Sequence, residues 1–274
     1  MKCGAAIRGT LALTLAIAVA AAGCAKHGPK DKHHGLTAPQ IYDLALKQMV
    51  KKSYFRARET LQNALGRNDS TPELVAKVHL ALADAYFLDG GILNLAEALS
   101  RYTNFLTFYP NHARADYAQY QLGLCYLKQT LNPDRDQAQT HKALDELAKV
   151  PRTYPNSDYL GLADEKADEA RELLAEHDFR IATFYFKKGE YIGATQRFRQ
   201  VLEAYPRYSR KDSLYLVLGR SLLALDKTDE GCLYLQKLVA EFPDCHEAGA
   251  ARHLLKEPCE AGSKGAALRS DARP

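Results

Sequence analysis

The sequence predicts an all-α fold, a solenoid that repeats one helix pair, and two observations support this prediction. The first is a fixed spacing: a small residue, a large apolar residue four positions later, and a proline eight positions after that. The second is a further helix, with a small residue of its own, ahead of each copy. Because proline cannot continue a helix, each copy should end at its proline and stack on the next. The four complete copies are Ala98-Tyr102-Pro110, Ala143-Leu147-Pro155, Ala194-Phe198-Pro206 and Gly231-Leu235-Pro243.

The small residues predict close packing within each pair. A small side chain on each helix lets two antiparallel helices approach closely, and the large apolar residue fills the space beside it. A first copy, Ala57-Leu61-Ala64, lacks the proline. The small residues of the preceding helices are Ala45, Ala83, Gly123, Ala182 and Gly219, and the aromatic residues before the prolines are Tyr109, Tyr154, Tyr205 and Phe242.

This arrangement resembles the tetratricopeptide repeat (TPR), in which a small pair and a tyrosine mark the first helix and alanine, phenylalanine and proline mark the second. The resemblance covers five helix-turn-helix repeats. An additional connecting helix, rich in alanine, glutamate and leucine, is expected at residues 158–176 and should split the repeats into three and two. We therefore expect repeats 1–3 over residues 38–157, repeats 4–5 with a capping helix over 175–256, and a polar, disordered tail over 257–274.

The N-terminus has the order of a secretory signal. Lys2 and Arg8 precede an apolar stretch from Leu11 to Ala22, which at about 18 Å as a helix is too short for a bilayer core of ~30 Å. Small residues directly before Cys24 resemble a bacterial lipobox. That resemblance implies a signal peptide over 1–23, a tether over 24–37, and an S-diacylglycerol and N-acyl group on Cys24. Ordinary cleavage that leaves a free Cys24 is the alternative.

Charge and motifs favour a binding protein over an enzyme. The net charge is +4, and loss of residues 1–23 would lower it by two, which gives no basic surface suited to nucleic acid. No phosphate-binding glycine loop, nucleophile elbow or HExxH motif is present. We therefore expect no catalytic residue, no metal and no cofactor besides the lipid on Cys24.

The cysteines near the C-terminus admit two interpretations. Export would place them in an oxidising compartment, where Cys245 and Cys259 could be joined across the short helix between them. Sequence alone does not determine disulfide connectivity. Cys245, His246, His253 and Cys259 could also suggest a metal cluster, but their spacing matches no familiar zinc pattern. Cys125 is expected to be a small core residue.

Stacked first helices of such repeats line a groove that accepts peptides. The lining expected in repeats 1–3 is apolar and aromatic, which suits an extended peptide with similar side chains. The alternative is that several of these residues pack against the neighbouring repeat or the tether. The candidates are Tyr42, Leu46, Met49, Leu80, Asp84, Phe87, Tyr117, Tyr120 and Leu124.

Four stretches carry a more specific resemblance. With the lipidated N-terminus and the division into three and two repeats, they make the chain similar to the YfiO/ComL family of outer-membrane lipoproteins, over about residues 38–255. The stretches are Asp116-Tyr117-x-x-Tyr120-x-x-Gly123-Leu124, Asp134-Arg135-Asp136 with Ala143, Tyr154-Pro155-Asn156-Ser157-Asp158-Tyr159, and Ala182-x-Phe184-Tyr185 leading into Gly189-x-Tyr191-x-x-Ala194 and Tyr205-Pro206.

The resemblance implies a non-enzymatic subunit of the β-barrel assembly (Bam) machinery on the periplasmic face of the outer membrane. Its partners would be the barrel subunit BamA, bound through the C-terminal repeats, other Bam lipoproteins, and unfolded outer-membrane proteins recognised by the N-terminal repeats. Residue Ala25, where an inner-membrane lipoprotein of enterobacteria would carry aspartate, is consistent with that location.

Two alternative functions remain at this stage. A TPR pilotin lipoprotein, which escorts a secretin, would be expected to have six regular repeats and no helix at 158–176. A cell-envelope or division scaffold of the CpoB type would carry an N-terminal coiled coil, and no heptad stretch precedes Ala38.

Overall fold

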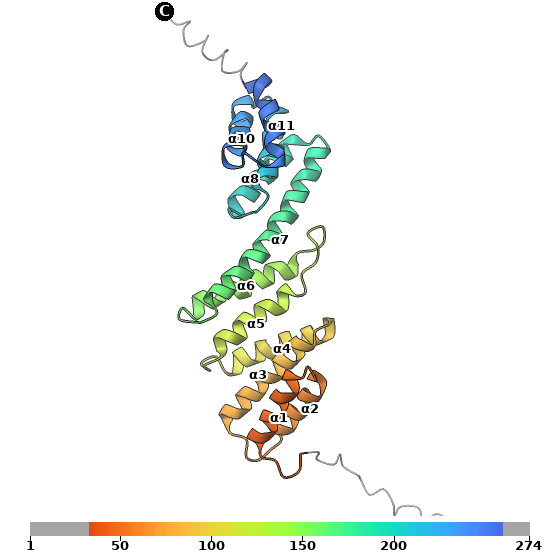
Figure 1. Ribbon diagram of the computed structural model, residues 1–274, viewed down its shortest axis with the longest axis vertical. Helices are drawn as coiled ribbons and strands as arrows, with labels where there is room; N and C mark the ends of the chain where they lie inside the picture. The colour runs from red at the N-terminus through yellow and green to blue at the C-terminus, as the bar shows by residue number, and fades with distance from the viewer. Residues whose placement is uncertain (1–32, 260–274) are drawn as a thin grey trace, which may run out of the picture. The chain divides into compact units, whose positions relative to one another are not determined.

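The computed structural model describes residues 33–259 and, over that range, contains eleven α-helices closed by one π-helical turn (Figure 1). The signal peptide, Cys24, most of the tether and residues 260–274 lie outside the described residues. No helix within 33–259 has the length and apolar character needed to cross a membrane. The helices are α1 (Ala38–Val50), α2 (Tyr54–Leu65), α3 (Pro72–Asp89), α4 (Ile92–Phe108), α5 (Ala115–Leu127), α6 (Ala138–Thr153), α7 (Leu160–Lys187), α8 (Tyr191–Ala204), α9 (Lys211–Leu223), α10 (Thr228–Glu241) and α11 (His246–Leu254), followed by η1 (Leu255–Cys259).

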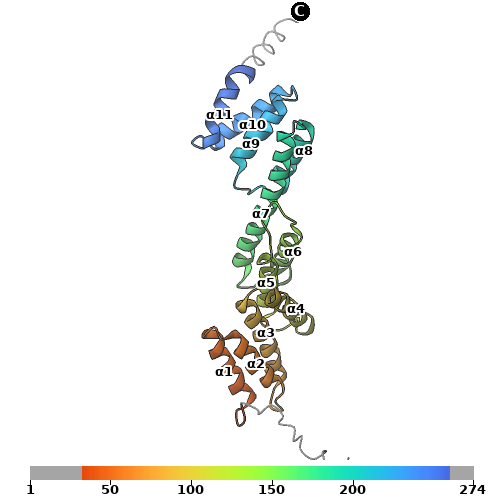
Figure 2. The same ribbon diagram turned by 90° about the vertical axis from the view of Figure 1, so that its right-hand side faces the viewer.

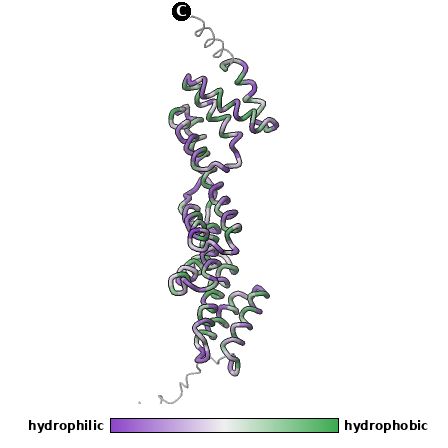
Figure 3. Tube along the Cα trace, turned by 90° about the vertical axis from the view of Figure 1, so that its left-hand side faces the viewer, coloured by the Kyte–Doolittle hydropathy of each residue, from purple (hydrophilic) through white to green (hydrophobic). Residues whose placement is uncertain are grey.

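The all-α fold class is confirmed, and the helices pair as the spacing predicts. Helices α1–α2, α3–α4, α5–α6 and α9–α10 form repeats 1, 2, 3 and 5, and each helix packs on the next in chain order (Figure 2). Hydrophobic positions recur along the helices between hydrophilic ones (Figure 3), as expected where each helix buries one face. The buried side chains of repeats 4 and 5 form one cluster, and those of repeats 1–3 form four smaller ones.

The expected separate helix at 158–176 is corrected by the structure. Helix α7 runs without a break from Leu160 to Lys187, so the connecting helix and the first helix of repeat 4 are one element. The physical reason is local, since no glycine or proline occurs between Gly161 and Gly189. Repeats 3 and 4 therefore share a continuous helix.

The role proposed for the small residues is confirmed at the glycines. A Cβ atom on Gly123 would lie 2.6 Å from Cγ of Leu147, and one on Gly219 would lie 2.8 Å from Cγ of Leu235. In both repeats the large apolar residue of the second helix occupies the space that the glycine leaves open. The spacing in the sequence thus records a tertiary contact between paired helices.

Loops between repeats connect back to the first helix of the repeat they leave. Asp69, for example, accepts a hydrogen bond from the backbone N–H of Ala38 at 2.9 Å. In repeat 4 the equivalent contacts fall in the middle of α7, which marks where the repeat begins within that helix. The other contacts are His112 with Glu73, Ser157 with Asp116, Ser209 with Glu172, Tyr208 with Glu176, and Ser213 with Glu247.

The long loop between α5 and α6 packs onto α7. The carbonyl of Pro133 lies 2.5 Å from Nδ1 of His177, and Arg180 forms an ion pair of 2.6 Å with Asp134. These contacts join the loop of repeat 3 to the half of α7 that belongs to repeat 4. They account for the Asp134-Arg135-Asp136 stretch noted in the sequence.

The predicted disulfide between Cys245 and Cys259 is wrong, since Cys259 is bonded to Cys232 on α10 and Cys245 is a free thiol. Cys245 lies at the N-terminal cap of α11, while η1 turns the chain back against α10 and brings Cys259 beside Cys232. The expected start of the disordered tail at residue 257 is therefore too early, because η1 extends to Cys259.

Candidate peptide-binding groove

The candidate groove residues divide into two groups by burial. Leu80, Phe87 and Tyr120 are core residues, at most 8% exposed. Leu80 and Phe87 belong to the core between α3, α4 and α5, and the ring of Tyr120 stacks on that of Tyr159 at 5.4 Å. For these three residues the alternative weighed from the sequence, packing against a neighbouring repeat, is the one the structure supports.

The remaining candidates keep part of their surface exposed. Tyr42 and Leu46 pack at the edge of the core between α1, α2 and α3, and Leu124 packs toward α6. Met49 and Tyr117 are half-buried. Of the predicted set, Tyr42, Asp84 and Tyr117 are linked by electrostatic or hydrogen-bonding interactions, and they come from α1, α3 and α5 in turn.

Asp84 is the centre of this polar group. The hydroxyl of Tyr102 on α4 donates a hydrogen bond to Oδ1 of Asp84 at 2.6 Å, and the hydroxyl of Tyr117 on α5 donates to the same oxygen at 3.0 Å. The carboxylate of repeat 2 therefore holds a tyrosine from its own repeat and one from repeat 3. Asp84 thus fixes the distance between consecutive first helices at the middle of the groove.

The pKa of Asp84 is raised, because burial disfavours its charged form more than its partners favour it. The hydrogen bonds from Tyr102 and Tyr117 and the charge of Arg114 act in the opposite direction. Burial, with the charge of Asp84 next, also raises the pKa of Tyr42. A carboxylate kept in an unfavourable site is a frequent sign of a functional position.

Arg114 and Tyr159 complete the site. The guanidinium of Arg114, an exposed residue just before α5, lies 4.3 Å from the ring centre of Tyr117. The ring of Tyr159, which precedes α7, lies 5.5 Å from that of Tyr117. The candidate groove therefore combines a guanidinium and a pair of aromatic rings with the carboxylate that holds Tyr117.

Two family-like stretches of the sequence meet here. The hydroxyl of Ser157 donates to Oδ2 of Asp116 at 2.7 Å, and Oγ of Ser157 accepts the backbone N–H of Tyr159 at 3.0 Å. Asp116 also accepts the backbone N–H of Tyr117 at 2.7 Å. This chain of hydrogen bonds orients the rings of Tyr117 and Tyr159 relative to each other.

The roles of Tyr102, Arg114 and Tyr159 were not predicted from the sequence. One signal was available for Tyr102, because it fills the large apolar position that the other repeats give to leucine or phenylalanine. A buried tyrosine hydroxyl needs a hydrogen-bond partner. The residue directly after Ala83 is the acid Asp84, which is the partner that the structure shows.

A concave region lies farther along the chain, between α7 and the α8–α9 loop. It is a cleft of about 630 Å³ whose charged side chains pair with one another: Arg171 and Arg207 both contact Asp168, each at 2.6 Å. Tyr205 and Tyr208 form its aromatic part. Charged side chains of the first half of α7 and aromatic side chains of the α8–α9 loop line this cleft together.

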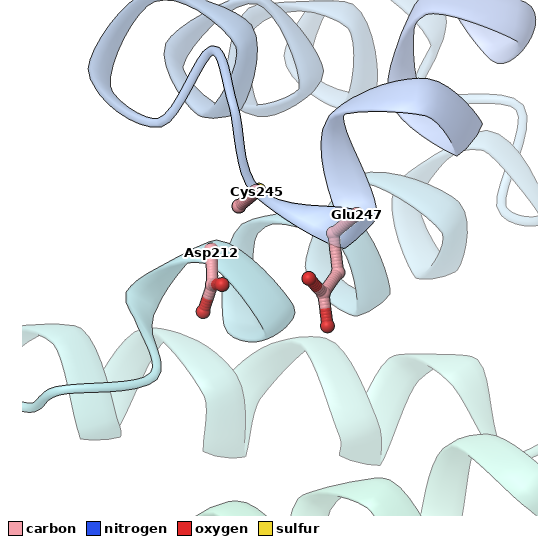
Figure 4. Close-up of side chains that lie close together, drawn as sticks. All are labelled: Asp212, Cys245 and Glu247. Carbon is pink, nitrogen blue, oxygen red and sulfur yellow. The ribbon is translucent and has the colours of Figure 1, made fainter.

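A cluster of possible metal ligands occurs at the start of repeat 5's capping helix. Figure 4 shows Asp212, Cys245 and Glu247 facing one another, with ligand atoms within 4.8 Å. Both carboxylates already accept hydrogen bonds from Ser213. Its backbone N–H donates to Asp212 at 2.7 Å, and its hydroxyl donates to Glu247 at 2.8 Å. The hydrogen bond from Ser213 is the main cause of the lowered pKa of Glu247. The cluster is accounted for as a junction between α9 and α11.

Comparison with known proteins gives the family. The model of a family described as "YfiO: Outer membrane lipoprotein" matches residues 35–230, which span both groups of repeats. The chain belongs to this family. The resemblance inferred from the four sequence stretches is thus confirmed, and the YfiO family associates the chain with the outer membrane.

Curated relatives agree with the YfiO assignment. "Outer membrane protein assembly factor BamD" of Caulobacter vibrioides is 32% identical over 181 residues, 63% of this chain and 59% of that protein. The protein of the same name from Neisseria gonorrhoeae is 25% identical, and the match covers 84% of this chain and 90% of that protein. The one from Rickettsia prowazekii is 27% identical, and the match covers 90% of this chain and 96% of that protein. Assembly factors are a non-catalytic kind of protein.

Solved structures of low identity are also similar. A structure described as the TPR2AB-domain:pHSP90-complex of yeast Sti1 has 15% identity and a TM-score of 0.46, and the match covers 80% of this chain and 84% of that one. A TPR protein from Thermus thermophilus has 16% identity and a TM-score of 0.35, and covers 80% of this chain and 99% of that one.

Proposed function

We propose that this chain is a lipoprotein subunit of an outer-membrane β-barrel assembly complex, acting as a scaffold with no catalytic activity of its own. The observation that carries the proposal is the family match, which runs from the start of repeat 1 into repeat 5. Relatives that match over most of their length are named assembly factors. On this proposal the chain holds client and barrel subunit on one solenoid.

The proposed attachment is through lipid on Cys24, at the periplasmic face of the outer membrane. The support is the order of the N-terminal sequence, a basic start, an apolar run and small residues before the cysteine. Several acyl chains hold a protein stably, whereas one myristoyl chain is marginal. Replacement of Cys24 by serine should release the protein into the soluble periplasmic fraction, and unchanged membrane retention would contradict the proposed acylation.

The proposed client site is the groove around Asp84. The backbone N–H groups of an extended peptide can donate hydrogen bonds to a carboxylate such as Asp84. The aromatic side chains of the peptide can stack on Tyr117 and Tyr159. Arg114 offers a cation at the edge of the same rings. These features suit unfolded outer-membrane proteins whose last strand is rich in aromatic residues.

The proposed contact with a BamA-like barrel subunit lies on repeats 4 and 5, with the other Bam lipoproteins as further partners. Phe184 at the end of α7 and Ile192 at the start of α8 are exposed large apolar side chains on either side of one turn. Exposed apolar side chains on both sides of one turn are typical of a protein contact surface.

A pull-down from detergent-solubilised outer membrane tests the function directly. We expect recovery of a BamA-like barrel protein with the wild-type chain. A Phe184→Ser, Ile192→Ser variant should recover less of it, while a Phe108→Ser variant, changed at an exposed residue of repeat 2, serves as the matched control. Recovery of a secretin without a barrel subunit would contradict the proposal and favour the pilotin function, and recovery of division proteins would favour a scaffold for division.

A further inference from the structure

The turns between the two helices of repeats 1 and 2 form an exposed edge that is both apolar and basic. Val50 and Phe55 flank the α1–α2 turn and are 84% and 65% exposed. Ile92 and Leu93 open α4 and are 82% and 85% exposed. These four large apolar side chains keep most of their surface exposed among the residues that the structure describes, so the edge has the character of a contact surface.

Contacts among α2, α3 and α4 make the two turns neighbours. Arg58 on α2 pairs with Asp89, the last residue of α3, at 2.7 Å. Asp89 also accepts a hydrogen bond from Asn94 on α4 at 3.1 Å. The first turns of α2 and α4 therefore lie on either side of the end of α3, and their exposed apolar residues belong to one edge.

The edge carries an excess of positive charge. No acidic residue occurs between positions 44 and 58, which include Lys47, Lys51, Lys52 and Arg56. Lys51, Lys52 and Arg56 are exposed, Asp89 is paired with Arg58, and the acids that flank the stretch in sequence are Asp43 and Glu59. Phenylalanine and aliphatic side chains next to lysine and arginine are typical of protein surfaces that lie at an anionic membrane interface.

Lys52 occupies a backbone conformation that suits glycine better. Its φ is 57°, and the corresponding turn of repeat 4 uses Gly189 at 81°. A lysine at a left-handed position is less favourable than glycine, because its Cβ crowds the backbone. The equivalent turn of repeat 5 has Asp226 at 58°, so the left-handed position belongs to the repeat turn, and of these three turns repeat 1 is the one that places a positive charge there.

We propose that this edge, defined by Val50, Lys51, Lys52, Phe55, Ile92 and Leu93, lies against an anionic phospholipid surface. Only 13 residues, 25–37, separate Cys24 from α1, and they span at most about 45 Å when extended. Helix α1 is 13 residues, or about 20 Å, long, so its far turn is within reach of the bilayer that would hold the acylated Cys24. The basic turn then binds lipid headgroups, and the apolar side chains enter the interface.

Because the chain contains no tryptophan, a single substitution makes a specific reporter. Acylated full-length protein carrying Phe55→Trp is reconstituted into vesicles of phosphatidylethanolamine and phosphatidylglycerol with brominated acyl chains. Phe108→Trp, at an exposed site at the other end of α4, is the matched control. We expect quenching and a blue shift of the tryptophan at position 55 and neither effect at position 108.

Two further variants separate charge from apolarity. Lys52→Gly, combined with Phe55→Trp, should lower the fraction of protein whose tryptophan contacts lipid by up to about fivefold in anionic vesicles, which is the effect of one cation near such a surface. The same substitution should raise the melting temperature. Ile92→Ser with Leu93→Ser should reduce quenching in all vesicles. Replacement of phosphatidylglycerol by phosphatidylcholine should reproduce the Lys52→Gly effect.

Three results would overturn the proposal. One is equal quenching at positions 55 and 108, and another is no quenching at 55 in protein that floats with the vesicles. The third is a blue shift at 55 that needs no vesicles and grows with protein concentration, which would assign the edge to a second copy of the chain. None of these results depends on the recovery of a barrel subunit, so the proposed function is tested separately.

Discussion

Tyr117 on α5 donates a 3.0 Å hydrogen bond to Asp84 on α3, which joins repeat 3 to repeat 2 at the middle of the candidate groove. Asp84 receives a second hydrogen bond from Tyr102 within its own repeat. The carboxylate therefore determines both the position of the Tyr117 ring and the polarity of the groove. Its substitution should separate the stability of the fold from the binding of a peptide.

Asp84→Asn should weaken peptide binding without lowering stability at neutral pH. The folded-state pKa of Asp84 lies above the unfolded value of 3.8, so the folded state binds the proton more tightly. The contribution of this group to the free energy of unfolding therefore falls as pH rises from the unfolded pKa through the folded pKa. Calorimetry should show that the variant loses this pH dependence. A marked fall in the melting temperature at pH 7, absent in the control Asp43→Asn on α1, would contradict the account.

Tyr117→Ala should lower affinity for a peptide from the last strand of a barrel protein by about tenfold, the usual range for an aromatic contact residue. Helicity should be unchanged, because Tyr117 is only half-buried. Fluorescence anisotropy measures the affinity, and Tyr126→Ala on the same helix is the control. Tyr120 is unsuitable for this test, since truncation of a buried aromatic residue costs about 3–5 kcal/mol of stability. Equal affinity of the Tyr117→Ala and wild-type proteins would mean that Tyr117 serves packing alone.

Glu176→Gln should destabilise the junction between α7 and repeat 5. Burial alone would raise the pKa of Glu176, but hydrogen bonds from Tyr208 and Arg180 and the charge of Arg210 outweigh it and lower the pKa. The stabilisation is present above the unfolded pKa of 4.5 and is lost as pH falls through the folded value. We expect a loss of about 2 kcal/mol at pH 7 by denaturant unfolding, which disappears in acid. A similar loss in Glu203→Gln, an exposed acid on α8, would argue against this specific role.

The disulfide should connect Cys232 and Cys259, whose Cα atoms are 5.8 Å apart. Mass spectrometry of a non-reduced digest should recover the two peptides joined, with Cys245 accessible to alkylation after unfolding. Closure of a loop of 27 residues predicts that Cys259→Ser lowers stability by about 3 kcal/mol. A peptide that joins Cys245 to Cys259 would contradict the structure and restore the pairing expected from the sequence.

The sequence was sufficient to predict the helix pairs, because their signals are local. Gly123 and Leu147 occupy fixed positions within one repeat, and the contact between them follows from the same spacing that identifies the repeat. The prolines, likewise, end the second helices where a backbone N–H would be needed. The fold class therefore agrees with the structure.

Features that depend on contacts between repeats were less predictable. Phe87 and Tyr117 lie on successive first helices of the pairs, yet only the structure shows that Phe87 is buried while Tyr117 keeps an exposed part. The pairing of Cys259 with Cys232 requires the reversal of the chain after α11, which no spacing indicates. The continuity of α7 could have been inferred from the absence of glycine and proline, a signal that the repeat pattern obscured.

The most direct test of the account is photo-crosslinking in intact cells from two positions of the solenoid. A photoreactive phenylalanine analogue replaces Met49, at the half-buried groove side of α1, or Phe184, at the exposed end of α7. The account predicts that position 49 captures unfolded outer-membrane proteins and that position 184 captures a BamA-like barrel subunit. Capture of a secretin at both positions, with neither clients nor a barrel subunit, would contradict it.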